Sequence, residues 1–231
     1  MKDYTETRIS FVRHGNVHNP GHVVYARLPG YRLSALGRQQ VEATASYLQG
    51  VRIDCFVCSP LLRAQETAAI IRRHHSEVPF ESSEAVNEVR VYFEGLPEGV
   101  LEARGWDMYT GIDGPFERPE DIARRLRAFV QRMLITHTGE TIVVPSHGDV
   151  IAFAVVALMG GTLVPAEKNA LKPYGITDGY PATGSVTTFA YGTTDATERP
   201  TLSYVRPYGD ELFVPQLGPG PEGVAGVDGA A

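Results

Sequence analysis

The chain is poor in cysteine and in long apolar runs. It has two cysteines in 231 residues. Its longest apolar run, 150–159, is far shorter than the roughly 20 residues that a membrane-spanning helix needs. The first residues show no apolar stretch behind a basic start, which is the mark of a secretory signal. We therefore expect a cytoplasmic protein with no membrane partner.

The two cysteines, Cys55 and Cys58, form a Cys-x-x-Cys pair. A zinc site of this type needs a second pair, which the sequence lacks, and a redox motif normally lies at the start of a helix. These cysteines lie instead inside a strand-like apolar stretch. We expect two small core side chains there.

Basic residues are also few, with 21 Lys and Arg against 27 Asp and Glu and a formal net charge of -6. Binding along a nucleic-acid backbone requires clustered positive charge, so we expect no nucleic-acid partner. The length and the 43% hydrophobic content are sufficient for one buried core. We therefore expect one main domain.

Apolar stretches alternate along the chain with segments of helical spacing. Strands are expected near 7–13, 52–58, 141–145 and 185–191, and helices over 35–49, 60–75, 119–133 and 150–159. Ser59 is the expected N-cap of the second helix, with Pro60 as its first residue. This alternation predicts an α/β protein, a three-layer α/β/α sandwich with a mainly parallel central sheet.

Three segments lack this periodicity. Residues 79–117 and 160–184 are rich in Gly, Pro and charge, and they are candidates for a lid over a pocket. From 207 onward the sequence is rich in Gly, Pro and Ala, which predicts a flexible tail over 207–231 after a domain spanning 1–206. A Gly-x-Gly-x-x-Gly match at 218–223 contains two prolines and follows no strand, so we interpret it as accidental.

Motifs with Arg or His follow three of the expected strands. They are Arg13-His14-Gly15, the segment Ser59 to Ala68 that contains Arg63, and Pro145-Ser146-His147-Gly148. The carboxyl ends of parallel strands meet at one edge of a sheet, where ligands bind. We therefore expect the arginines and histidines of the three motifs to lie together.

Such a group suits a phosphomonoester. Arg13, Arg63 and His147 can donate hydrogen bonds to phosphate oxygens, and a guanidinium offers two parallel donors and a permanent charge. A neutral His14 can attack phosphorus and form a phosphohistidine that water then hydrolyses. Gly15 would let the backbone approach the phosphate. This chemistry requires no metal and no other cofactor.

The three motifs together resemble the histidine phosphatase superfamily, the phosphoglycerate-mutase-like proteins. The segments Leu33 to Gln39 and Asn87-Glu88 with Phe93-Glu94-Gly95 are similar to further motifs of that family, so the resemblance runs from about residue 8 to about residue 190. It implies the same three-layer fold. It also implies His14 as the nucleophile and Arg13, Arg63 and His147 as the phosphate pocket.

The leaving alkoxide needs a proton, which a carboxylic acid with a raised pKa can supply. The resemblance implies Glu88 in this role, and Glu84 and Glu94 are alternatives nearby. The chain departs from the family pattern after Gly15. Asn19 is displaced from the position where the family has a phosphate-binding Asn, so Asn19 or Asn16 is expected to replace that contact.

The segment 25–32 is close in sequence to the first motif. Tyr25 and Arg27 are therefore candidates to contact the part of the substrate beyond its phosphate, although a turn with solvated arginines is an equal alternative. The motifs favour a metal-independent hydrolase of small phosphomonoesters. A phosphoglycerate-type mutase and a phospholigand-binding protein without turnover remain alternatives. Neither the natural substrate nor the oligomeric state is indicated by the sequence.

Overall fold

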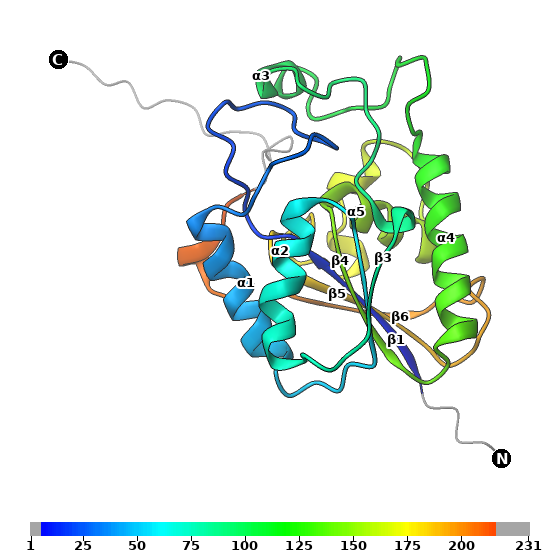
Figure 1. The fold of residues 1–231 in the computed structure, drawn as a ribbon. Helices are drawn as coiled ribbons and strands as arrows, with labels where there is room; N and C mark the ends of the chain where they lie inside the picture. The colour runs from blue at the N-terminus through cyan, green and yellow to red at the C-terminus, as the bar shows by residue number, and fades with distance from the viewer. Residues whose placement is uncertain (1–5, 216–231) are drawn as a thin grey trace.

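A six-stranded mixed sheet forms the centre of the computed structural model, which describes residues 6–215 (Figure 1). The strands are β1 (Thr7–Arg13), β2 (Cys55–Cys58), β3 (Phe80–Ser82), β4 (Thr141–Ser146), β5 (Val186–Tyr191) and β6 (Thr201–Val205). Their order is β3-β2-β4-β1-β5-β6. The pairs β2/β3, β2/β4 and β1/β4 are parallel, whereas β1/β5 and β5/β6 are antiparallel.

Both faces of the sheet are buried, because successive side chains of a strand point to opposite faces. In β1, Phe11 packs into one apolar core and the next residue, Val12, packs into a second one. In β4, Val144 and Val143 divide between the two cores in the same way. The sequences of these strands are therefore nearly continuous apolar runs, as is typical of a sheet that is covered on both sides.

Helices cover the two faces. They are α1 (Ala35–Leu48), α2 (Leu62–Ile71), α3 (Glu98–Glu102), α4 (Pro119–Thr136) and α5 (Gly148–Leu158), with 3₁₀ turns η1 (Arg72–His74), η2 (Glu84–Val86), η3 (Glu167–Asn169), η4 (Lys172–Tyr174) and η5 (Asp210–Leu212). Val41 of α1 and Ile70 of α2 pack with Val12, and Phe129 of α4 and Phe153 of α5 pack in the other core. Figure 1 shows the pair α1 and α2 on one side of the sheet and α4 on the other. The predicted three-layer α/β fold is confirmed.

Some elements and boundaries differ from the sequence-based expectations. The edge strands β3 and β6 and the short helix α3 were not predicted, since β3 is exposed throughout and β6 is only half-buried, which leaves no apolar run to detect. The prediction of Ser59 as the N-cap of α2 is wrong. The helix begins at Leu62, and its N-cap, Leu61, makes no side-chain capping hydrogen bond.

The prediction of a flexible tail is also wrong for residues 207–215. The Tyr208 hydroxyl donates to the Thr183 carbonyl, and the Gln40 side-chain amide donates to the Leu212 carbonyl at 2.7 Å. Residues 207–215 therefore pack against the domain. The remainder of the predicted tail, with the 218–223 match, lies outside the described residues.

Two further expectations concern cysteine and membranes. Cys55 and Cys58 are buried in β2 and neither is in a disulfide, as expected for small core residues. Among the helices of the described part of the chain, none is long and apolar enough to span a membrane.

Candidate active site

The ends of β1 and β4 bring the first and third motifs together. These two strands are parallel neighbours, with Arg13 opposite Ser146 in the register. The His14 amide donates to the Ser146 carbonyl at 3.0 Å, and the ring centroids of His14 and His147 are 5.3 Å apart. The expectation that both histidines meet at one edge of the sheet is met.

The ring of His14 is held in one orientation. Its Nδ1 atom lies 2.8 Å from the carbonyl oxygen of Gly15. Burial, followed by the positive charges of Arg63 and Arg13, lowers the pKa of His14 well below its ordinary value of 6.5. The ring is therefore neutral at pH 7. Because a carbonyl oxygen only accepts, Nδ1 carries the proton and Nε2 keeps its lone pair.

Two arginines lie beside this ring. Arg63, in the first turn of α2, is fully buried, and its guanidinium donates to the Ala26 carbonyl at 2.7 Å and lies 4.8 Å from the centroid of the Tyr25 ring. The Arg13 guanidinium donates to the Pro181 carbonyl at 2.7 Å. Both side chains are thus fixed by carbonyl groups, and the charge that they concentrate favours an anionic ligand.

Glu88 is the carboxylate of this cluster. Its Oε2 atom is 3.4 Å from Arg63 Nη2 and 3.4 Å from His147 Nδ1. Burial raises the pKa of Glu88 above its usual 4.5, although Arg63 acts in the opposite direction. The alternatives Glu84 and Glu94 are engaged elsewhere, since Glu84 accepts from the Asn87 amide and Glu94 accepts from the backbone of Arg27.

His147 has a partner that the sequence did not reveal. Its Nε2 lies 2.7 Å from the Ser59 hydroxyl oxygen, and the backbone amide of Leu61 donates to the same oxygen. Burial and the Arg63 charge lower the pKa of His147 well below 6.5, so this ring is neutral at pH 7 as well. The only signal for Ser59 was its place in the second motif, where a helix cap explained it equally well.

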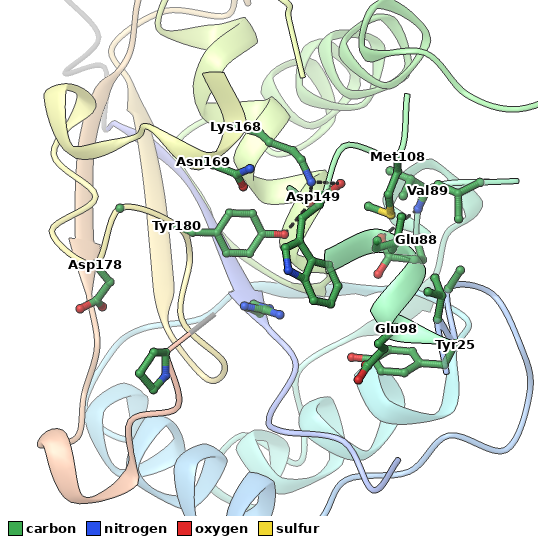
Figure 2. A pocket seen from close by; sticks show the side chains of 18 of the residues that line it. Tyr25, Glu88, Val89, Glu98, Met108, Asp149, Lys168, Asn169, Asp178 and Tyr180 are labelled. Carbon is green, nitrogen blue, oxygen red and sulfur yellow. Dashed lines mark hydrogen bonds and ion pairs between the residues drawn. The ribbon is translucent and has the colours of Figure 1, made fainter. Parts of the chain in front are cut away.

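A cavity of about 550 Å³ opens next to the cluster. Its lining residues are Arg13, Val24, Tyr25, Ala26, Glu88, Val89, Val91, Glu98, Leu101, Trp106, Met108, Asp149, Lys168, Asn169, Lys172, Asp178, Gly179, Tyr180, Phe213 and Pro215. Figure 2 shows Glu88 and Tyr25 on one side of it and Tyr180 and Lys168 on another. Both segments predicted as a lid, 79–117 and 160–184, contribute to this lining.

Among the predicted site residues, Arg13, Glu88 and Tyr25 line the cavity, whereas His14, Gly15, Asn19, Arg27, Arg63 and His147 are not among its lining residues. Tyr25 lines it, as expected, but Arg27 does not. The Arg27 guanidinium donates to the Glu88 carbonyl at 2.6 Å and pairs with Glu117 at 3.0 Å. These contacts engage Arg27 within the protein, and its role as a substrate contact stays a prediction. A loop position close in sequence does not determine where a side chain points.

Asn19, the expected phosphate contact, forms hydrogen bonds within the protein, and its contact with phosphate stays a prediction. Its amide donates to the Val23 carbonyl at 3.0 Å and to the carboxylate of Glu98 in α3 at 3.1 Å, so it links its loop to α3. The side chain of Asn16 accepts from the Ser34 hydroxyl at 2.7 Å. Both asparagine side chains thus form hydrogen bonds with other parts of the protein.

Gly15 supports the site through a close approach of two backbones. A Cβ atom at Gly15 would lie 2.3 Å from the carbonyl oxygen of Gly37, in the first turn of α1. No larger residue fits between the loop after β1 and α1 without a shift of the backbone. The identity of Gly15 therefore fixes the path of the chain directly after His14.

Three side chains of the cluster could also hold a cation. One ligand atom each of His14, Glu88 and His147 lies within 4.8 Å of the other two. Neutral imidazoles and a carboxylate are suitable ligands for Zn²⁺. The guanidinium groups of Arg13 and Arg63 act against a cation and in favour of an anion at the same place.

A second polar cluster was not foreseen. The Asp149 carboxylate accepts from Lys168 Nζ at 2.8 Å, from the Tyr180 hydroxyl at 2.6 Å and from the Tyr109 hydroxyl. Asp149 and Lys168 are both buried. The one available signal was a single acidic residue directly before the all-apolar run 150–159.

The sequence of the chain is similar to those of known proteins. Residues 9–178 match the family model of the histidine phosphatase superfamily (branch 1). An uncharacterized protein of Mycobacterium tuberculosis is 37% identical over 149 residues, which are 62% of this chain and 73% of that protein. The adenosylcobalamin/alpha-ribazole phosphatase of Escherichia coli is 25% identical over 169 residues, 69% of this chain and 81% of that protein.

The same fold occurs among solved structures. The native structure of the mycobacterial glucosyl-3-phosphoglycerate phosphatase superposes with a TM-score of 0.68 at 22% identity. The match covers 85% of this chain and 97% of that one. This similarity establishes the fold.

Proposed function

The chain belongs to the histidine phosphatase superfamily, and on that premise we propose that it hydrolyses small phosphomonoesters through a phosphohistidine formed on His14. The observation that carries this proposal is the orientation of the His14 ring. Its Nδ1 is 2.8 Å from the Gly15 carbonyl, so Nε2 is the free nucleophilic atom beside Arg13, Arg63 and His147.

In the first step, Nε2 of His14 attacks phosphorus and the bond to the ester oxygen breaks. The electron pair of that bond leaves with the oxygen, and the protonated form of Glu88, which the raised pKa of this carboxyl favours, donates its proton to it. Arg13 and Arg63 stabilise the charge on the equatorial oxygens. His147 can donate from Nδ1 to a phosphate oxygen in the tautomer in which Nε2 accepts from the Ser59 hydroxyl.

In the second step, water attacks the phosphorus of the phosphohistidine. The carboxylate of Glu88 now accepts the proton of the water, the bond from phosphorus to Nε2 breaks, and inorganic phosphate leaves. Glu88 thus returns to its protonated form and His14 to its neutral form. Arg13 and Glu88 line the cavity, and Arg63 and His147 are buried within 3.4 Å of Glu88.

The size of the cavity supports a small substrate. About 550 Å³ is within the range that encloses a small organic ligand. Two of the similar proteins carry the names of small phosphorylated substrates, the alpha-ribazole phosphatase and the glucosyl-3-phosphoglycerate phosphatase. We infer a small phosphorylated metabolite as the substrate of this chain, held by its phosphate at Arg13 with its alcohol part along the apolar lining.

The test is release of inorganic phosphate from a panel of phosphomonoesters with excess chelator present. The wild-type protein should release phosphate, and His14→Ala should not. After incubation with a phosphomonoester that carries radiolabelled phosphate, the wild-type protein should hold covalently bound label that is stable to alkali and labile to acid. Strict dependence on added divalent metal would contradict the mechanism and favour the cation-binding geometry.

A mutase and a binding protein without turnover make different predictions in the same assay. A mutase would isomerise phosphoglycerate once a bisphosphorylated primer is added, with little release of phosphate. A binding protein would bind inorganic phosphate in a titration and release none from any ester.

A further inference from the structure

Asp149 is the centre of a buried polar cluster that lies outside the proposed reaction. Its carboxylate receives hydrogen bonds from three side chains, Lys168, Tyr180 and Tyr109. Figure 2 shows Lys168 and Tyr180 converging on Asp149 from the same side of the cavity. Asp149 is the second residue of α5, so the cluster is built on a rigid element that begins directly after His147.

The cluster joins segments that are far apart in the sequence. Lys168 and Tyr180 come from the predicted lid segment 160–184, and Tyr109 comes from the other one, 79–117. A buried charge is tolerated only when it is paired and its hydrogen-bonding capacity is satisfied. The Asp149 carboxylate satisfies both conditions, so its orientation and those of its partners are tightly determined.

Tyr180 connects this cluster to the proposed phosphate pocket. Its ring centroid is 5.1 Å from Cζ of Arg13, which is within the distance of a cation–π interaction. The next residue, Pro181, provides the carbonyl that accepts from the same guanidinium at 2.7 Å. The hydroxyl at the far end of the ring is held by Asp149 at 2.6 Å.

The close packing of Tyr180 on α5 restricts it further. A Cβ atom at Gly148 would lie 2.3 Å from the Tyr180 hydroxyl oxygen. The ring therefore rests against the start of α5, and Asp149 fixes its hydroxyl there. A change at this hydroxyl would be transmitted to Arg13 through the ring and through Pro181.

We propose that Asp149 and Tyr180 are positioning residues for the Arg13 guanidinium, and that their hydrogen bond sets the affinity of the site for phosphate. The inference rests on the proposed function in that it takes Arg13 as a phosphate ligand. It assigns no chemical step to either residue.

A direct chemical role for these two groups does not fit their surroundings. Burial acts to raise the pKa of Asp149, but Lys168 and the donated hydrogen bonds outweigh it and leave the pKa below its ordinary value. Burial and the Asp149 charge raise the pKa of Tyr180 well above 10. Asp149 is therefore an acceptor without a proton to give, and the Tyr180 hydroxyl keeps its proton for Asp149.

The main test is Tyr180→Phe, which removes one oxygen and keeps the ring. Calorimetric titration of the full-length protein with inorganic phosphate should give a dissociation constant about fivefold higher than that of wild type, since the ring loses its anchor. KM for a phosphomonoester should rise by a similar factor. Asp149→Asn should act in the same direction.

Two matched variants separate positioning from general support of the fold. Tyr109→Phe removes another hydroxyl bond to the same carboxylate, from a ring that packs edge-on against Phe153. Tyr174→Phe removes a hydroxyl bond to Glu167 within the same segment as Tyr180. Tyr174→Phe should change the phosphate dissociation constant less than twofold. Tyr109→Phe leaves the bond between Tyr180 and Asp149 in place, so it should weaken phosphate binding less than Tyr180→Phe does. If Tyr174→Phe weakens phosphate binding as much as Tyr180→Phe, the segment only supports the fold and the inference is wrong.

A double-mutant cycle provides a second readout. If Tyr180 acts through Arg13, then Tyr180→Phe should have an effect of less than about twofold in an Arg13→Lys background, and the two changes should be strongly non-additive. Additive effects would overturn the inference. If the wild-type protein neither binds inorganic phosphate nor releases it from any ester, the proposed function is wrong. If the wild-type protein does both and Tyr180→Phe binds phosphate as tightly as wild type, only the positioning role is wrong.

Discussion

Nδ1 of His14 lies 2.8 Å from the carbonyl oxygen of Gly15, the residue that follows it. The same glycine lets the loop pass close to Gly37 of α1. One residue therefore has two roles at this point, because its carbonyl selects the tautomer of the ring and its missing side chain sets the path of the backbone.

The first prediction concerns the acidic side of the pH profile. Burial, Arg63 and Arg13 lower the pKa of His14, so the neutral nucleophile persists at pH values below 6.5 and is lost only when the ring is protonated at lower pH. We expect the acidic limb of kcat/KM to have its midpoint below 6.5, and His14→Ala to lower activity at least about a thousandfold. A midpoint above 6.5 would contradict this environment for His14.

The second prediction distinguishes an acid from a charged neighbour at Glu88. Glu88→Gln should lower kcat/KM for an alkyl phosphate about a hundredfold or more, and that for p-nitrophenyl phosphate much less, because nitrophenolate leaves without a proton. In wild type, activity on the alkyl ester should fall as the pH rises through the raised pKa of Glu88, since the protonated form is then lost.

The control for this experiment is Glu94→Gln, because Glu94 is exposed and accepts only from the backbone of Arg27 among the contacts of the described residues. It should keep the wild-type ratio between the two esters. An equal loss on both esters in Glu88→Gln would show that Glu88 acts through charge and not as a proton donor.

The third prediction concerns Gly15. In Gly15→Ala the new methyl group would lie 2.3 Å from the Gly37 carbonyl oxygen, so the loop or α1 must move. We expect a loss of about 2 kcal/mol or more in unfolding free energy and a large loss of kcat. Urea unfolding and steady-state kinetics measure both. Gly50→Ala, where nothing lies within 4 Å of the added atom, should be close to wild type in both measurements.

The fourth prediction assigns Ser59 to the site and not to the helix. Ser59→Ala removes the hydroxyl that lies 2.7 Å from His147 Nε2, and we expect kcat/KM to fall about tenfold at 25 °C. Ser34 is a matched comparison, since it is the N-cap of α1 and accepts from the Gly37 amide at 3.0 Å. Ser34→Ala should lower the unfolding free energy by about 1 kcal/mol. If kcat/KM of Ser59→Ala equals that of wild type, Ser59 has only a structural role.

The fold and the centre of the site could be predicted because they depend on local patterns. Val12 and Phe11 belong to a strand that is apolar on both faces, and Arg13 and His14 follow at its carboxyl end. Parallel neighbours then place His147 beside them without any further information. The edge strands could not be predicted in this way, since few of their side chains are buried.

The outer parts of the site depend on contacts between distant segments, which no local pattern encodes. Asp149 and Lys168 are 19 residues apart and meet because an irregular segment folds back onto α5. The described part of the predicted tail packs through Leu212, whose carbonyl accepts from Gln40, and brings Phe213 to the cavity. Composition rich in Gly and Pro concealed this packing.

The last prediction tests the role that the sequence suggested for Arg27. Its guanidinium donates to the Glu88 carbonyl at 2.6 Å and pairs with Glu117, so it supports the loop that carries Glu88 and does not line the cavity. Arg27→Ala should therefore lower kcat/KM by a similar factor, about tenfold, for every ester in a panel. Arg38→Ala, which removes an exposed ion pair with Glu66, should have no measurable effect. A change in the order of substrate preference in Arg27→Ala would instead place this arginine against the substrate.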